Sequence, residues 1–160
     1  MNDAIINDTK FIYQRNLAGD IKKSNSMFPN NKRTACIIIS NEQAEQMAAE
    51  GYDIKWTKPR EGENTKNFVS KAFLNVELKY RNKFNEMIKY PPKVYLVIDN
   101  ETPVLLSEET VGQLDDIRVK NVNVVIHPSI DEASNSLKPY IRIMYVEQNI
   151  DDDPFAQRYK

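Results

Sequence analysis

The sequence predicts a mainly β protein, because short apolar runs separated by turn residues outnumber the segments with helical spacing. Six or seven such runs are rich in Ile, Val, Tyr and Phe, and Pro, Gly, Asn and Asp punctuate them. Near Asn121 the alternation shifts by one residue, since Val119 is an odd position whereas Val122 is even. Such a shift indicates a β-bulge, which helps to curve a sheet into a barrel. With only two or three short helices, the pattern is typical of a closed or nearly closed β-barrel or a β-sandwich.

The first 33 residues predict one strand and one basic loop. Residues 11–15 alternate Phe, Tyr and Arg on one face after a polar leader, and residues 17–20 have the composition of a turn. Residues 22–33 combine four cations with Ser, Asn and Pro, which cannot form an apolar face. The cations are Lys22, Lys23, Lys32 and Arg33. We expect a mobile loop that clamps phosphates; alternatively, these charges only keep the surface hydrophilic.

A strand, a helix and a second strand are expected between residues 34 and 58. Ser40 stands at the N-cap position of a helix over residues 41–50, and Gln43 occupies the capping-box position. Gly51 suits the left-handed conformation that ends such a helix. Residues 52–58 then alternate apolar and charged side chains. Because Trp56 shares a face with other apolar residues there, it is either a core residue or an exposed stacking ring.

The longest alternating run predicts a strand over residues 68–80, after a charged hairpin loop at residues 59–66. The positions expected to face a core are Leu74, Val76, Leu78 and Tyr80. The positions expected to face solvent are Phe73, Asn75, Glu77 and Lys79. This two-faced pattern is typical of an antiparallel sheet with one wet side.

The second half of the chain predicts three more strands. Residues 81–90 are basic and loosely helical, and Pro91 and Pro92 stop any helix there. A strand is expected at residues 93–98, a turn at 99–103, and a short helix from 107 to about 114 with acidic residues in its first turn. The last two strands, at residues 117–126 and 140–146, are expected to enclose a loop.

These elements predict a single β-barrel domain over residues 1–148, followed by an acidic and aromatic C-terminal tail at residues 149–160. A chain of 160 residues can bury a substantial core without a disulfide, and Cys36 is its one cysteine. The sequence shows neither a signal-peptide pattern nor a run of about 20 apolar residues. We therefore expect a cytoplasmic protein with no membrane contact.

The net charge of −1 conceals an asymmetry along the chain. Residues 1–93 carry 16 Lys and Arg against 11 Asp and Glu, whereas residues 94–160 carry 6 against 12. A basic first half favours a polyanionic ligand, and an acidic second half favours a segment that competes with this ligand or recruits a partner. The alternative is an ordinary fluctuation of surface charge.

The sequence offers no constellation typical of an enzyme, and we expect neither catalysis nor a bound metal or cofactor. It has one histidine, one cysteine and four scattered glycines, without a P-loop or a dinucleotide-binding pattern. His127 has no neighbouring His or Cys with which to bind a metal, so a capping or surface role is expected. Because carboxylates are abundant, a carboxylate-dependent nuclease stays as a third hypothesis.

Aromatic and basic residues are interleaved in the first half, which favours binding of single-stranded nucleic acid. Bases stack on exposed rings for ~1–3 kcal/mol each, while Lys and Arg follow the phosphates. We expect Lys22, Lys23, Lys32 and Arg33 to form a flexible clamp, and Lys55, Lys58 and Arg60 to form a phosphate track. The candidate stacking rings are Tyr13, Trp56 and Phe73, with Arg15, Lys79 and Arg81 as further cations of the interface.

Several motifs together resemble the phage-encoded single-stranded DNA-binding proteins with an OB-type barrel. They lie at residues 15–19, 43–45, 51–52, 55–60, 91–95, 106–114, 121–126, 140–146 and 153–156, and at Tyr159. The resemblance implies an OB-like Greek-key barrel with basic loops. It also implies a protein that coats single-stranded DNA without sequence preference in DNA replication or recombination, in the cytoplasm of the host cell.

The end of the chain resembles a different motif, the acidic tip by which bacterial single-stranded DNA-binding proteins recruit replication enzymes. The matching residues are Asp151, Asp152, Asp153, Pro154 and Phe155. Five residues follow Phe155 here, whereas the Phe is terminal in those proteins. Three roles therefore stay open for the tail: recruiting replication or recombination enzymes, competing with DNA, or packing on its own domain or a second copy.

A protein-binding module is the alternative from a different class of function. The near-neutral net charge and the acidic second half favour, for instance, a phage inhibitor of a host enzyme. A homo-oligomer is compatible with both hypotheses.

Overall fold

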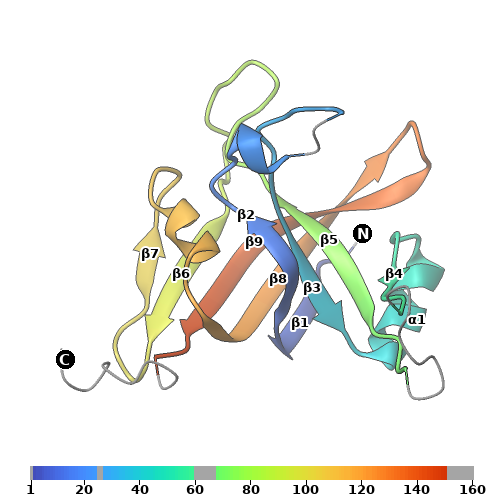
Figure 1. Cartoon of the computed structure of the whole chain (residues 1–160). Coiled ribbons are helices and arrows are strands. Elements are labelled where there is room, and N and C mark those ends of the chain that lie inside the picture. Colours follow the sequence, from blue (N-terminus) through green and yellow to red (C-terminus); the bar gives the residue numbers. More distant parts are fainter. Residues whose placement is uncertain (1, 25–26, 60–67, 151–160) are drawn as a thin grey trace.

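The computed structural model describes residues 2–24, 27–59 and 68–150, and this part of the chain is mainly β (Figure 1). Within these ranges, nine strands form one sheet, with one α-helix and two 3-10 helices. The strands are β1 (Ala4–Thr9), β2 (Phe11–Asn16), β3 (Arg33–Ile39), β4 (Lys55–Trp56), β5 (Ala72–Leu78), β6 (Lys93–Ile98), β7 (Val104–Leu106), β8 (Val119–Asp131) and β9 (Ser136–Gln148). The helices are α1 (Asn41–Glu50), η1 (Ile21–Lys23) and η3 (Val111–Asp115).

The strand order is β1-β8-β9-β5-β3-β2, and its two ends belong to consecutive strands. Lys10 alone separates β1 from β2, and its carbonyl accepts a hydrogen bond from Ile38 N of β3 at 3.0 Å. The two end strands of this order, β1 and β2, are therefore joined through Lys10. β5 and β6 both pair with β9 in parallel, whereas the other strand pairs are antiparallel. This arrangement confirms the prediction of a mainly β, OB-like fold.

Irregularities in register bend the sheet where the sequence predicts a bulge and at three further places, one of which lies between Ile6 and Thr9 in the pairing of β1 with β8. The pairing of β8 with β9 shifts between Val119 and Asn121, and again between Val125 and Ile126. The pairing of β2 with β3 shifts after Ile12, where Tyr13 has a φ of 65°. A bulge increases local twist and redirects a side chain. The bulge in β2 thereby places Tyr13 on the outer surface, where it is 60% exposed.

The helix α1 begins and ends as predicted. Ser40 Oγ accepts a hydrogen bond from Gln43 N at 3.2 Å, which satisfies one of the free N–H groups of the first turn. Gly51 ends the helix with a φ of 113°, a conformation that favours glycine. The buried residues Ala44 and Met47 attach the helix to the core.

Two predictions in the middle of the chain are wrong in extent or in type. The strand expected at residues 52–58 is reduced to Lys55–Trp56, because Tyr52 is buried and forms an isolated bridge with Leu137. Residues 81–90 are not helical. Asn82 Oδ1 accepts hydrogen bonds from Phe84 N and Glu86 N, and these side chain–backbone bonds favour a turn over a helix.

The strands near both ends of the chain are longer than predicted. The polar leader forms β1, and residues 127–139, expected in a loop, mostly extend β8 and β9. Pro128 lies opposite Pro139, beyond the residues of β8 that pair with β1, and such edge positions tolerate proline. His127 accordingly lies within β8. The short strand β7 was not predicted, and the expected helix near residue 110 is the 3-10 helix η3.

The core lies inside the curved sheet and is built from alternate strand positions. Leu74, Val76, Leu78 and Tyr80 are buried as predicted, together with residues of β3, β6, β8 and β9. The side chains between them point to the outer face of the sheet, as the alternation along β5 requires. The side chains of the sheet that a ligand can reach therefore lie on this outer face. No helix in the described ranges is long and apolar enough to cross a membrane.

Candidate nucleic-acid interface

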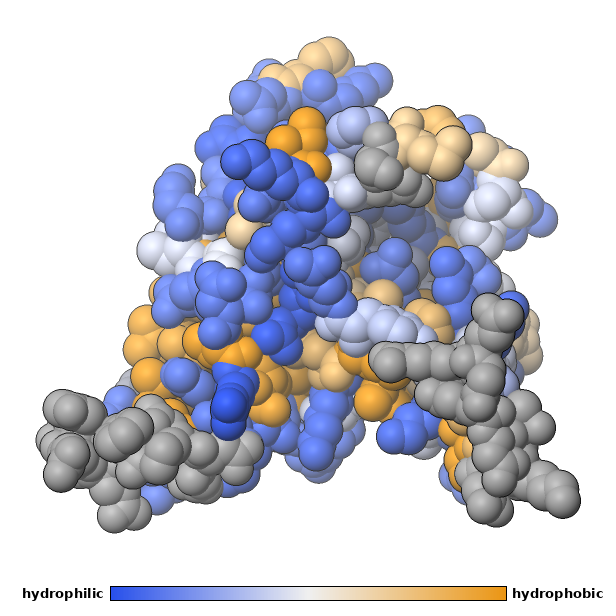
Figure 2. Space-filling model, in the orientation of Figure 1, coloured by the Kyte–Doolittle hydropathy of each residue, from blue (hydrophilic) through white to orange (hydrophobic). Residues whose placement is uncertain are grey.

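A groove crosses the outer face of β3 and β5, between the loop that follows β2 and the β8–β9 hairpin. It consists of two adjoining cavities of about 310 Å³ and about 250 Å³, which share Lys32, Thr34 and Asn75 as lining residues. The first cavity lies beside the loop, and the second extends to Lys138 of the hairpin. Figure 2 shows a recess on this face, surrounded mainly by hydrophilic side chains. We call this feature the β3–β5 groove.

Two of the three predicted stacking rings lie together beside the β3–β5 groove. Tyr13 and Phe73 meet edge to face, with ring centroids 5.2 Å apart. Phe73 is on the same face of β5 as Asn75, which lines the groove, and it pairs across strands with Lys55. Because the Tyr13 ring is also largely exposed, this pair leaves aromatic surface open to a ligand beside the groove.

Trp56, the third predicted ring, is separated from this pair. It lies opposite Ala72, whose side chain is in the core, whereas the neighbouring Lys55 lies opposite Phe73. Since paired residues of an antiparallel ladder point to the same side, Trp56 is on the side of β4 away from Phe73. It is 43% exposed at the edge of the sheet, and thus neither a core residue nor part of the groove.

The charge along the β3–β5 groove is uneven. The cavity beside the loop is lined by three cations and no carboxylate, whereas the cavity beside the hairpin is lined by three lysines and three carboxylates. In the second cavity Lys138 Nζ lies 3.5 Å from Glu77 Oε1, and burial and Glu77 act in opposite directions on the pKa of Lys138, with a net rise. The loop end of the groove therefore has no lining carboxylate to offset the charge of Lys32.

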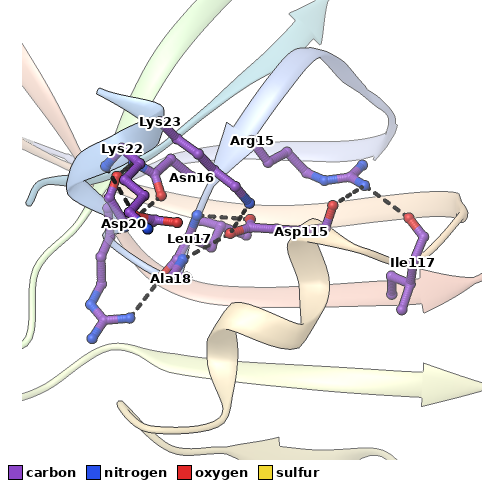
Figure 3. A network of polar contacts seen from close by, with 10 residues as sticks. Arg15, Asn16, Leu17, Ala18, Asp20, Lys22, Lys23, Asp115 and Ile117 are labelled. Carbon is purple, nitrogen blue, oxygen red and sulfur yellow. Dashed lines mark hydrogen bonds and ion pairs between the residues drawn. The ribbon is translucent and has the colours of Figure 1, made fainter. Parts of the chain in front are cut away.

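Some predicted phosphate contacts instead hold the loop in place (Figure 3). Arg15 Nη2 donates a hydrogen bond to the carbonyl of Ile117 at 2.8 Å, and burial lowers the pKa of this arginine. Arg33 Nη1 donates to the carbonyl of Leu17 at 2.8 Å, and its guanidinium lies over the ring of Tyr80. Both side chains reach backbone groups across the loop, so their first role is structural.

Asp115 is the centre of this anchoring network. Its two carboxylate oxygens accept hydrogen bonds from Leu17 N at 2.8 Å and Ala18 N at 3.0 Å, and Lys23 Nζ lies 3.7 Å away. The Asp115 side chain is only 1% exposed. Gly112 allows this close approach, because a Cβ there would lie 2.7 Å from Ala18 Cβ. The base of the loop is thus attached to η3, about 100 residues away in sequence.

The remaining predicted cations differ in their exposure and in whether a carboxylate pairs with them; we call an exposed cation without such a partner open. Within the described residues, the side chains of Lys22, Lys32, Lys55 and Lys58 are exposed and have no ion-pair partner. Lys79 Nζ lies 5.6 Å from the centroid of the Tyr140 ring. Arg81 makes a forked hydrogen-bonded pair with Glu108, at 2.9 Å from Nη2 to Oε1, which offsets its charge.

Part of the predicted site lies outside the described residues. This holds for Arg60 of the phosphate track and for the whole tail motif, Asp151, Asp152, Asp153, Pro154 and Phe155.

Sequence reasoning missed the contribution of β9 to this surface. Lys138 lines the groove, and the ring of Tyr140 lies between the ammonium groups of Lys138 and Lys79, each 5.6 Å from its centroid. The alternation of Lys138, Tyr140 and Arg142 across Pro139 was the available signal. It was overlooked because residues 127–139 were expected to be a loop.

The described residues contain no group of three or more His, Cys, Asp or Glu side chains placed to hold a metal ion. What they do contain is an exposed groove with open lysines and a ring pair beside it, on an OB-like sheet.

Comparison with known proteins assigns the chain to a family. A family model described as "Putative phage ssDNA-binding domain" matches residues 1–160. Comparison with curated proteins and with solved structures gave no match. Since the family match spans the whole chain, the protein belongs to this family of phage single-stranded DNA-binding domains.

Proposed function

We propose that this protein coats single-stranded DNA without sequence preference during phage DNA replication or recombination, and that the DNA lies in the β3–β5 groove. The observation that carries the proposal is the groove itself, where the open cations Lys32 and Lys55 lie beside the ring pair of Tyr13 and Phe73. Family membership supports the same ligand.

Binding would follow from two contributions that do not depend on base identity. Lysines at the groove release counterions from the phosphates, and this contribution weakens as salt rises. A base can stack on the exposed ring of Tyr13, which Phe73 contacts edge to face. Few cations in the groove lack a carboxylate partner. This favours a single strand over a duplex, because a duplex carries about twice the phosphate density and hides the faces of its bases.

The proposal is tested by fluorescence anisotropy of labelled oligonucleotides at several salt concentrations. We expect dT and mixed-sequence single strands to bind alike, with log K falling as log salt rises by about 0.7 per phosphate contacted. A duplex of the same sequence serves as the control and is expected to bind more weakly. Absence of binding, or binding that salt does not weaken, would exclude the groove as a phosphate-binding site.

Recruitment of replication or recombination enzymes through residues 151–155 is the second part of the proposal, and it rests on the sequence motif alone. It is tested by comparing the full chain with a chain that ends at Ile150, as bait for such enzymes in the presence of nuclease. The supporting result is that the shortened chain no longer retains the partner enzyme while its free energy of unfolding is unchanged.

One observation favours the alternative function, a protein-binding module. A cavity of about 700 Å³ lies between β7 and the residues preceding β6, and its exposed apolar side chains include Tyr90 and Leu105, at 80% and 58%. Exposed apolar clusters of this kind often mark protein interfaces. A stoichiometric host protein that is retained after nuclease treatment and lost in Leu105→Glu would favour this function over DNA coating.

A further inference from the structure

A second cavity on the outer face of the sheet is lined by cations and rings. It has a volume of about 660 Å³ and lies between residues 79–92 and the outer face of β8 and β9. Its lining includes Lys79, Lys83 and Arg142, the rings of Tyr90 and Tyr140, and no carboxylate. We call it the β8–β9 pocket. It shares no lining residue with the β3–β5 groove.

The electrostatics of the β8–β9 pocket favour an anion more clearly than those of the groove beside the hairpin. Asp3, which is not a lining residue, accepts a hydrogen bond from Arg142 Nη1 at 2.8 Å and so offsets one of the charges. Lys79 and Lys83 have no ion-pair partner in the described part of the chain and lie over aromatic rings. An ammonium group over a ring keeps its charge available for a phosphate.

The pocket can also receive a base. Tyr90 is 80% exposed at its rim, and Tyr140 forms part of its wall. Asn82, His127 and Ser129 add polar groups that can donate or accept hydrogen bonds. Exposed rings next to cations are the combination that binds single strands with tolerance of sequence.

The groove and the pocket adjoin at Tyr140. Lys138 lines the groove, Lys79 lines the pocket, and both ammonium groups lie 5.6 Å from the centroid of the Tyr140 ring. Tyr140 pairs with Glu77 of β5, so all of these side chains are on the outer face. A nucleic-acid strand that leaves the groove past Lys138 would reach the pocket directly.

We propose that the β8–β9 pocket is a second subsite for single-stranded DNA, occupied by the part of a long strand that has passed Tyr140. Lys79 and Lys83 bind its phosphates, and Tyr90 stacks on one of its bases. This inference rests on the proposed function, since it continues the path of the same strand. It predicts that the subsite contributes only when the strand is long enough to reach it.

The test compares two oligo-dT lengths, roughly 6 and roughly 16 nucleotides, which span the usual site sizes of OB folds. In the double variant Lys83→Gln/Tyr90→Ala, affinity for the longer strand should fall at least about fivefold, as loss of one stacked base predicts. Affinity for the shorter strand should stay within about twofold, because it is held in the groove. Lys120→Gln is the matched control, since Lys120 is a half-exposed cation near Glu147, outside both sites.

Each outcome separates the subsite from the proposed function. If the double variant loses affinity equally for both lengths, or loses none for the longer strand, the subsite proposal is overturned. Binding of both lengths by the unchanged protein would still support the groove. If the unchanged protein binds neither length, the proposed function fails and the subsite fails with it. Photo-cross-linking of the unchanged protein to a long halogenated strand is independent of any folding defect in the variant. We expect a cross-linked peptide that contains Tyr90, and its absence would count against the subsite.

Discussion

Two regions of the molecule carry many cations but use them differently: the loop between β2 and β3 with the strand ends that flank it, and the segment between β5 and β6. In the first region, Arg15 of β2, Lys23 of the loop and Arg33 of β3 are engaged with Asp115 or with backbone carbonyls. In the second, Lys79, Lys83 and Lys89 lie over aromatic rings. A carbonyl or carboxylate partner fixes the cation and offsets its charge, whereas a ring orients the cation and leaves its charge open.

The number of cations in a region does not determine how many are available to a ligand. Three of the five cations in and beside the loop after β2 are engaged with Asp115 or with backbone carbonyls (Figure 3). Lys22 and Lys32, which are exposed, remain available to a ligand. The segment after β5 has only Arg81 paired with a carboxylate among its described cations, and offers more charge to a ligand.

The largest expected effect comes from removing the anchor of the loop. Asp115→Ala removes the acceptor of the Leu17 and Ala18 N–H groups and leaves both without a hydrogen bond. We expect this to lower the free energy of unfolding by about 2–4 kcal/mol, as measured by chemical denaturation. Asp116→Ala, the exposed neighbour, is the matched control and should change stability by less than about 0.5 kcal/mol. Equal effects of the two variants would mean that the loop is not anchored through Asp115.

A smaller effect distinguishes an open cation from an engaged one within the same loop. Lys32→Gln should weaken binding of oligo-dT about fourfold at ~0.15 M salt and reduce the salt slope by about 0.7, because one phosphate contact is lost. Arg33→Gln should instead lower the free energy of unfolding by about 1 kcal/mol, since a hydrogen bond to Leu17 O and the contact with Tyr80 are lost.

The salt slope decides between these two roles more clearly than the affinity does. If Arg33→Gln lowers the slope as much as Lys32→Gln does, then Arg33 leaves Leu17 to contact phosphate, and the contrast between engaged and open cations fails for this residue. Thermal unfolding of both variants provides the stability measurement that accompanies the titrations.

The smallest effect concerns the ion cluster of Asp3, which precedes β1 and bonds with His127 of β8 and Arg142 of β9 beside the β8–β9 pocket. The hydrogen bond from His127 holds the pKa of Asp3 below its usual value of 3.8, with help from Arg142. A lowered folded-state pKa stabilises the fold above pH 3.8, and this contribution is lost as pH falls further. Since the cluster is exposed, Asp3→Asn should cost only about 0.5 kcal/mol near pH 7.

Denaturation at pH 7 and at pH 3 measures this contribution. We expect the difference between Asp3→Asn and the unchanged protein to shrink at the lower pH, because the carboxylate is then being protonated in both folded and unfolded states. A difference that grows on acidification would contradict the sign of the pKa shift.

Much of the fold could be predicted from the sequence, wherever local signals act alone. The capping of α1 by Ser40 and Gly51, the alternation along β5 and the bulge near Asn121 follow from neighbouring residues, and all three are confirmed. Two predictions were wrong for different reasons. In residues 81–90 the Asn82 side chain accepts hydrogen bonds from nearby backbone N–H groups and favours a turn over a helix. Pro128 is accepted in β8 because it lies beyond the residues that pair with β1, and this depends on a pairing that is distant in sequence.

The candidate site could be predicted only in part, for the same reason. The alternation along β5 was enough to place Phe73 and Asn75 outside, and composition was enough to mark the loop as basic. The meeting of Tyr13 with Phe73, the separation of Trp56 from them, and the contribution of Lys138 and Tyr140 depend on strand pairing and register. A one-residue difference in register moves a side chain to the other face.

The sequence by itself determined that this protein is mainly β and rich in interleaved cations and rings, because alternation, turns and composition are local properties. Only the tertiary structure decided which cations are open to a ligand. Asp115 lies about 100 residues from the loop that it holds, and β9 brings Lys138 and Tyr140 beside β5 through a pairing that no local pattern encodes. Charge is a property of residues, whereas its availability depends on the partners that the fold supplies.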